Sequence, residues 1–303
     1  MSADLLIRLV GMSVPSAELS KRTKESAAAT LAPDGVLHPK YVSRKAGGDA
    51  AYILCWRKAI ENLQPGTYKR IAGRVLLPPS LSNYIAHLLR LRVLQELELL
   101  TERLEWAMRK RKNMGDYAPI LRRLSNAEWG SIFSTGILPY GGAVAVLVAP
   151  RPNRDRVTKE RPQPSMSARP PEDEEMREGL PPVSVLMPNS TLSVPDETAL
   201  LPPLKIPLYN SISAFPSRSQ RAALYDFLTR ILAAERFFKR LRDPRRTNPT
   251  ESLEEIKEDS GKGSHAFILY SNKQTARKAD SAAVALALWR LRMYESEGWA
   301  LAE

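Results

Sequence analysis

An apolar stripe in residues 81–107 constrains the fold of this chain more than any other feature of its sequence. Hydrophobic side chains recur there every three or four positions, which predicts a helix that Ser80 caps and that runs to about Met114, just before Gly115. The stripe comprises Leu81, Tyr84, Ile85, Leu88, Leu91, Leu94, Leu97, Leu100, Leu104 and Ala107. Because a stripe of about four heptads needs cover, we expect this helix to pack against another, within the fold or in a second chain. Packing within the fold is the favoured interpretation.

Helical spacing also occurs in two segments nearer the N-terminus. Apolar residues at positions 5–10 can share one helix face, and residues 1–31 add basic and small side chains, as mitochondrial transit peptides do. Acidic residues in the same segment favour an ordinary N-terminal helix instead. A further helix is expected over residues 49–63, with Tyr52 and Cys55 on its apolar face. We interpret Cys55 as a packing residue rather than a nucleophile.

Strands are expected as well as helices. The β-branched apolar run Ala143–Val148 predicts a buried strand, and its candidate neighbours are Arg74–Leu77 and His265–Tyr270. The segment Leu204–Tyr209 has the pattern of an edge strand. These elements predict an α+β (mixed), helix-dominated fold with a long amphipathic helix, a few short strands and a proline-rich disordered insertion.

Two capping signals place further helices. Ser125 and Glu128 form a capping box that opens a short helix, and Ser217 and Gln220 repeat the pattern before a longer one. A final helix is expected over residues 273–295.

Proline divides the chain. Of its 24 prolines, 12 lie in the 54 residues from Pro150 to Pro203, where no apolar periodicity is present. Such a composition cannot bury enough apolar surface to offset the entropy of ordering, so the segment is predicted to be a linker or insertion. The predicted parts are an N-terminal segment (1–44), a helical or α+β core (45–150), the linker (151–203) and a C-terminal α+β part (204–303).

The charge balance favours a polyanionic partner. The 303 residues carry a net charge of +12, with an isoelectric point near 9.8, and nucleic acid is the first candidate for such a surplus. The alternative is a basic protein without such a partner. One cysteine permits neither an intrachain disulfide nor a thiolate zinc cluster, and no apolar run approaches the roughly 18–20 residues of a membrane span. We expect an intracellular protein, in the mitochondrial matrix or otherwise in cytoplasm or nucleus.

Catalytic motifs do not emerge from the sequence. Its three histidines are far apart and lack the spacing of metal ligands. The run Gly261-Lys262-Gly263-Ser264 resembles a phosphate-binding loop superficially, but Gly263 occupies the place of the hydroxyl residue, so a flexible turn is the favoured reading. No cofactor or metal is expected, and an enzyme of an unrecognised type is kept only as a third hypothesis.

Basic clusters at predicted helix ends are the candidate binding sites. Their side chains are expected to contact phosphates. The candidates are Arg109, Lys110, Arg111, Lys112, Arg236, Lys239, Arg240, Arg242, Arg245, Arg246, Lys273, Arg277 and Lys278. They favour a non-catalytic protein associated with nucleic acid, RNA in particular, or with a ribonucleoprotein. Such a protein would be a structural or assembly factor in organellar or cytoplasmic gene expression. The alternative is a helical scaffold that docks a protein partner through Leu81–Met108.

The last of these clusters has a structural analogy. A strand followed by a helix with Lys273, Arg277 and Lys278 in its first turns is similar, over about 30 residues, to the second half of a double-stranded RNA-binding domain. The analogy implies phosphate contacts from the basic residues, with the alanines after Lys278 packed on a sheet. Asp280 departs from the pattern, and no family is assigned. An alanine-rich helix with a charged first turn is the alternative.

Overall fold

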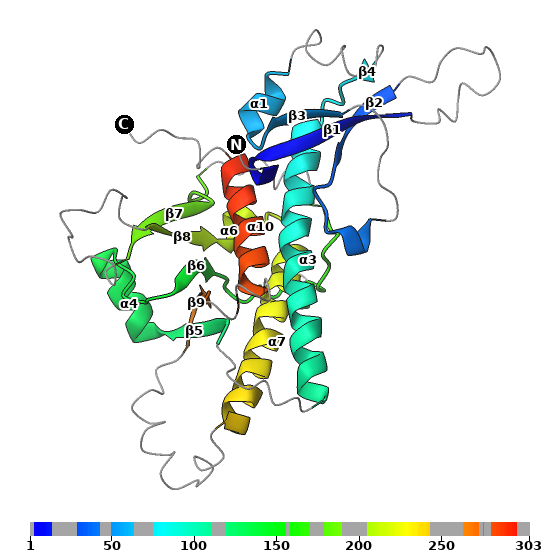
Figure 1. The fold of residues 1–303 in the computed structure, drawn as a ribbon. Helices are drawn as coiled ribbons and strands as arrows, with labels where there is room; N and C mark the ends of the chain where they lie inside the picture. The colour runs from blue at the N-terminus through cyan, green and yellow to red at the C-terminus, as the bar shows by residue number, and fades with distance from the viewer. Residues whose placement is uncertain are drawn as a thin grey trace, which may run out of the picture. The chain divides into compact units, whose positions relative to one another are not determined.

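The computed structural model describes residues 3–13, 29–42, 50–63, 75–110, 119–155, 158–169, 179–189, 205–242, 263–272, 275 and 280–295. Residue contacts divide the chain into two compact units. Unit 1 is Met1–Gln95 with Ala287–Glu303, and unit 2 is Glu96–Leu286. Both units combine helices with a sheet, so the fold is mixed α/β (Figure 1). The described strands form a four-stranded and a five-stranded sheet, more than the few short strands expected.

Unit 1 contains the four-stranded sheet, in the order β3-β1-β2-β4. Strand β1 is antiparallel to both of its neighbours, and β2 is parallel to β4. The elements are η1 (Ala3–Leu5), β1 (Leu6–Ser13), β2 (Ala29–Asp34), η2 (Pro39–Tyr41), β3 (Ala50–Leu54), α1 (Arg57–Glu61) and β4 (Val75–Leu76). Helix α3 (Leu81–Arg109) and helix α10 (Asp280–Tyr294) each contribute residues to both units.

Two helices expected near the N-terminus are wrong. After the single turn of η1 the chain forms strand β1, in which Ile7 and Leu9 are buried while Arg8 between them pairs with Asp34. This alternation has the period of a strand, and pairing with β2 and β3 decided against the helix that the same apolar residues allow. Residues 14–28 lie outside the described part of the chain.

The predicted helix over residues 49–63 is instead strand β3 followed by the short helix α1. Tyr52 points away from the core with 63% of its surface exposed, because β3 pairs with β1 and alternates its side chains. Cys55 is buried as expected, and burial raises the pKa of its thiol to about 11.

Helix α3 begins at Leu81, as its apolar spacing predicts, and most of the stripe is buried. Tyr84 is an exception, with 39% of its surface exposed. The burial extends well beyond the stripe, since polar side chains such as His87, Arg90 and Glu96 are buried too. A helix covered on more than one face is less amphipathic than the sequence indicated. The helix ends at Arg109, before the predicted end near Met114, which lies outside the described residues.

Unit 2 contains the five-stranded sheet, in the order β5-β9-β6-β8-β7. Neighbouring strands are antiparallel except for β6 and β8. The elements are β5 (Leu121–Ser125), α4 (Asn126–Thr135), β6 (Ala143–Val148), β7 (Ser184–Pro188), β8 (Lys205–Asn210), α6 (Ser211–Ala214), α7 (Arg218–Arg242) and β9 (Gly263–Tyr270).

The pairing of this sheet confirms some strand predictions and corrects others. The buried strand at 143–148 is β6, and its neighbour at 265–270 lies within β9. The other candidate neighbour, 74–77, is wrong because β4 pairs with β2 in unit 1. The segment at 204–209 is β8, which lies between β6 and β7 and is not an edge. The edge strand on that side of the sheet is β7, which falls within the predicted linker.

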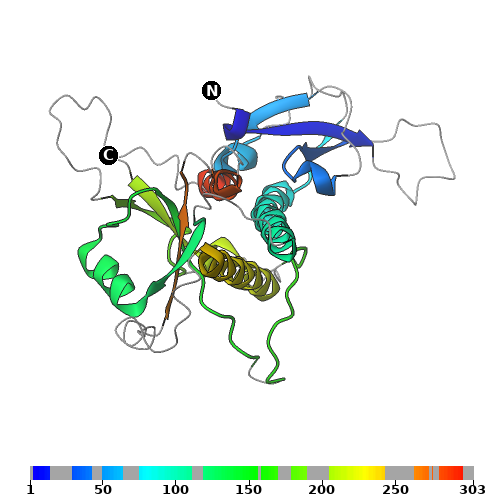
Figure 2. The ribbon, with the colours of Figure 1, turned by 60° about the horizontal axis from the view of Figure 1, so that its bottom comes forward.

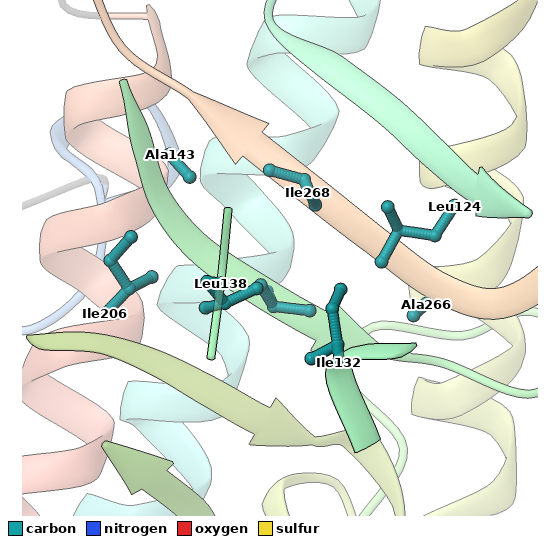
Figure 3. Close-up of a cluster of buried hydrophobic side chains, with 8 residues drawn as sticks. Leu124, Ile132, Leu138, Ala143, Ile206, Ala266 and Ile268 are labelled. Carbon is teal, nitrogen blue, oxygen red and sulfur yellow. The ribbon is translucent and has the colours of Figure 1, made fainter. Parts of the chain in front are cut away.

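Buried side chains from strands and α4 form a core on one face of the sheet (Figure 3). Ile132 of α4 and Leu138 after it point onto residues of the central strands, such as Ile268. The local sequence places α4 because Ser125 accepts from the Glu128 backbone while the Glu128 carboxylate accepts from the Ser125 backbone. Gly136, with φ of 67°, ends this helix in the left-handed conformation.

Candidate nucleic-acid interface

The C-terminal half of α3 and helix α7 run side by side in the same direction, so their C-terminal ends lie at the same end of unit 2 (Figures 1 and 2). Arg230 of α7 holds Glu105 of α3 by two parallel hydrogen bonds, 2.7 Å from Nε to Oε1 and 2.9 Å from Nη2 to Oε2. The bidentate geometry sets the two helices in register.

This register brings together two basic clusters that are far apart in the sequence. Arg109 and Lys110 follow Glu105, and Arg236, Lys239 and Arg240 follow Arg230. At about 1.5 Å per helical residue, all five lie roughly 6–15 Å beyond the Arg230–Glu105 pair. We call these five residues the helix-end cluster.

All members of the helix-end cluster are exposed. None of the five forms an ion pair with another residue in the part of the chain that the structure describes. Of the remaining residues predicted for these two clusters, Arg242 is the last residue of α7. Arg111, Lys112, Arg245 and Arg246 lie outside the described residues.

Acidic groups near the cluster are occupied by structural contacts. A hydrogen bond from Arg230 lowers the pKa of Glu105, and Arg109 contributes to the same shift. The Glu235 carboxylate accepts from the backbone amides of Ile120 (2.8 Å) and Leu121 (3.3 Å), which ties α7 to the start of β5. Glu105 thus offsets part of the Arg109 charge, whereas the Glu235 carboxylate is directed to backbone amides.

An aromatic side chain lies among the cations, and the sequence patterns did not single it out. Trp106 of α3 precedes Arg109 and Lys110 by three and four positions, which places it next to them on the helix surface. It is 46% exposed although the apolar stripe beside it is buried. The sequence did contain a signal for this exposure. Trp106 lies between the stripe residues Leu104 and Ala107 in the sequence, but its position falls on the polar side of the helix.

The third predicted cluster cannot be placed, because Lys273, Arg277 and Lys278 lie outside the described residues. Two neighbouring positions depart from the RNA-binding-domain analogy. Asp280 is buried and pairs with Arg103, so it joins α10 to α3 within unit 2. Ala282, expected to pack on a sheet, is exposed.

The glycine-rich run before β9 is not a free turn where it is described. Gly263 and Ser264 already belong to β9, and the Ser264 hydroxyl donates to the Leu124 carbonyl at 2.9 Å. The Arg123 guanidinium covers Gly263 so closely that an added Cβ would lie 2.9 Å from its Nε. Arg123 donates to the carbonyls of Gly263 and Ser264, so these groups serve the sheet.

Another charged cluster in unit 2 is structural. Arg122 lies over the Tyr140 ring at 4.9 Å and pairs with Glu128 at 2.8 Å, while the Tyr140 hydroxyl donates to Glu128 at 3.0 Å. Burial and this hydrogen bond raise the pKa of Tyr140, whereas the hydrogen bonds to Glu128 outweigh its burial and lower the pKa of that carboxyl. Because Glu128 also completes the cap of α4, the cluster holds α4 to β5.

Within the described residues, no three His, Cys, Asp or Glu side chains are grouped so that they could hold a metal ion. Helices in the same residues lack the combination of length and apolarity needed to cross a membrane. No protein family, curated protein or solved structure gives a significant match to this chain. The helix-end cluster is therefore interpreted from its geometry and charge.

Proposed function

We propose that the protein binds nucleic acid, RNA in particular, through the helix-end cluster. The observation that carries the proposal is the meeting of two basic clusters at one end of two parallel helices, with an exposed tryptophan beside them. Lysine and arginine supply phosphate contacts, and an exposed aromatic ring supplies a platform on which a base can stack. This chemistry suits a structural or assembly factor in gene expression, in mitochondria, cytoplasm or nucleus, that needs no catalytic group.

Helix capping is the competing explanation for these cations. Each helix C-terminus carries the equivalent of about half a negative charge, so two parallel helices present about one negative charge together. The helix-end cluster places five positive charges there. This excess over the charge of the helix ends favours an external anion.

The alternative, a scaffold that docks a partner through Leu81–Met108, has less support. Nearly all of the apolar stripe is buried within the chain itself, including Leu94, Leu97 and Leu104. A partner helix would have to displace this packing to reach the stripe.

The first prediction is steep salt dependence of RNA binding by the full chain. Five phosphate contacts imply a log–log slope of about −3.5 to −4.5, hence a loss of affinity of about 100- to 500-fold between about 50 and 200 mM salt. Fluorescence anisotropy with a single-stranded RNA of about 20 nucleotides, repeated with a duplex of the same length, measures the slope. Absence of binding to RNA or DNA at low salt would refute the proposal.

The second prediction separates nucleic acid from other polyanions. Trp106→Ala should weaken RNA binding by about 1–3 kcal/mol, because it removes a stacking platform. Retention on heparin should stay unchanged, since a sulfated polysaccharide has no bases to stack. Trp106→Phe keeps an aromatic face and should recover part of the loss. Equal losses on RNA and heparin would contradict a stacking role.

A further inference from the structure

The start of the proline-rich segment is an ordered arm attached to α7. We call the described residues 150–155 and 158–169 the basic arm, which Figure 2 shows as the long green trace that leaves the sheet. The Gln220 side chain, fully buried, donates to the Met166 carbonyl at 2.8 Å, and the Ser165 amide donates to the Ser219 carbonyl at 3.2 Å. The arm is thus anchored at the first turn of α7, although its composition predicted a disordered linker.

A second anchor holds residues 153 and 155 of the basic arm. Arg218 donates to the Asn153 carbonyl at 3.1 Å and to the Asp155 carboxylate at 3.4 Å. The Asp155 carboxylate also accepts from the Thr158 amide at 3.1 Å, and the Asp155 amide donates to the Glu160 carbonyl at 2.7 Å. These bonds hold residues 153–155 and 158–160 close together beside Arg218.

Beside these residues lies an open surface hollow of about 390 Å³, lined by Arg154, Lys159, Glu160, Arg161 and Gln163. Three of the lining side chains are cationic and one is acidic, which leaves a net charge of +2. None of the three cations forms an ion pair with a residue that the structure describes. Like charges held close together in excess of the one acidic group favour the binding of an anion.

We propose that the basic arm is a second RNA-contacting surface, in which Arg154, Lys159 and Arg161 bind backbone phosphates and Asp155 positions them. The inference rests on the proposed function, because it assigns the same partner to a second site. RNA is favoured over an isolated phosphate because the arm is anchored at the first turn of α7 and the helix-end cluster lies at the far end of the same helix. From Arg218 to Arg240, 22 positions at about 1.5 Å span about 33 Å, so the two surfaces contact different phosphates of one strand or duplex.

The test compares two charge-matched double variants of the full chain. Arg154→Gln with Arg161→Gln removes two arm cations, and Lys58→Gln with Lys205→Gln removes two exposed cations outside both surfaces. Lys159 is left in place because its backbone has φ of 57°. A contact is worth a factor of about 5 to 8 per decade of salt, so the arm variant should bind RNA at least about ten-fold more weakly than the control. Its salt slope should be shallower by about 1.4 to 1.8.

Asp155→Ala tests the positioning role against a purely electrostatic one. The substitution makes the chain more positive, so an account based on net charge alone expects tighter RNA binding. If Asp155 positions the arm, the variant should instead bind RNA about three-fold more weakly or worse. Its melting temperature should stay close to that of the parent, because a solvated turn contributes little to stability. Tighter or equal binding would overturn the positioning role.

The outcomes also separate this inference from the proposed function. If the parent protein binds no RNA, both fail. If the parent binds with a steep salt slope but the arm variant behaves like the Lys58 and Lys205 control, only the arm inference fails. If inorganic phosphate at millimolar concentration binds the arm while RNA affinity is the same in the arm variant and the control, the hollow is a phosphate site and the RNA assignment is overturned.

Discussion

Replacing Leu94 by aspartate should abolish soluble, folded protein or lower its melting temperature steeply. The Leu94 side chain is fully buried in the middle of α3, so the substitution places an unpaired charge where no water reaches it. The expected cost is at least about 3 kcal/mol, which is a large fraction of the total stability of a domain. Soluble yield and thermal melting followed by circular dichroism measure the effect.

The matched control is Tyr84→Asp on the same helix. Tyr84 is on the apolar stripe but partly exposed, and an acidic residue in the first turn interacts favourably with the helix dipole. It should therefore be much less destabilising than Leu94→Asp. If Leu94→Asp is as stable as the parent and instead loses a protein partner, the stripe is a docking surface and the scaffold hypothesis gains.

Neutralising the whole helix-end cluster should reduce RNA affinity by about 3.5 to 4.5 orders of magnitude at about 0.1 M salt. The variant carries glutamine at Arg109, Lys110, Arg236, Lys239 and Arg240. Each phosphate contact contributes about 0.7 to 0.9 to the salt slope. The slope measured for the neutralised variant should therefore reflect only the phosphate contacts made elsewhere, such as those of the basic arm. The loss should be similar for RNAs of different sequence, because phosphate contacts carry no base information.

Folding of this variant should be nearly unaffected, since exposed substitutions usually change stability by within about ±0.5 kcal/mol each. Thermal melting in parallel with the binding assay verifies that the loss is not unfolding. The Lys58→Gln, Lys205→Gln control measures how much RNA affinity is lost through a lower net charge alone. A neutralised protein that binds RNA as well as its parent would show that these cations serve only the helix ends and solubility.

Features carried by neighbouring residues were predictable from the sequence. The capping box at Ser125 and Glu128 occurs as expected, because its two hydrogen bonds need only a span of three residues. The start of α3 and the buried strand β6 were also visible in local periodicity. Burial of Cys55 was predicted correctly, although the helix that was expected to carry it does not exist.

Features that depend on pairing between distant residues were not predictable. The apolar residues at 6–10 fit a helix or a strand, and contact with β2 and β3 selected the strand. Strand β7 is short, has no apolar alternation and pairs along its length with β8, which offers it a hydrogen-bonding edge. The basic arm is held in place for a similar reason, since backbone groups of Ser165 and Met166 bind to the first turn of α7.

The candidate site shows the same division. The charges at the ends of α3 and α7 can be read from the chain, because helix length and charge are local properties. Their meeting at one surface depends on the Arg230–Glu105 pair, which joins residues 125 positions apart. The exposure of Trp106 likewise depends on which side of α3 its neighbours cover. A one-dimensional pattern contains no such distance, so only the packing of the folded chain turned two basic helix ends into a single surface.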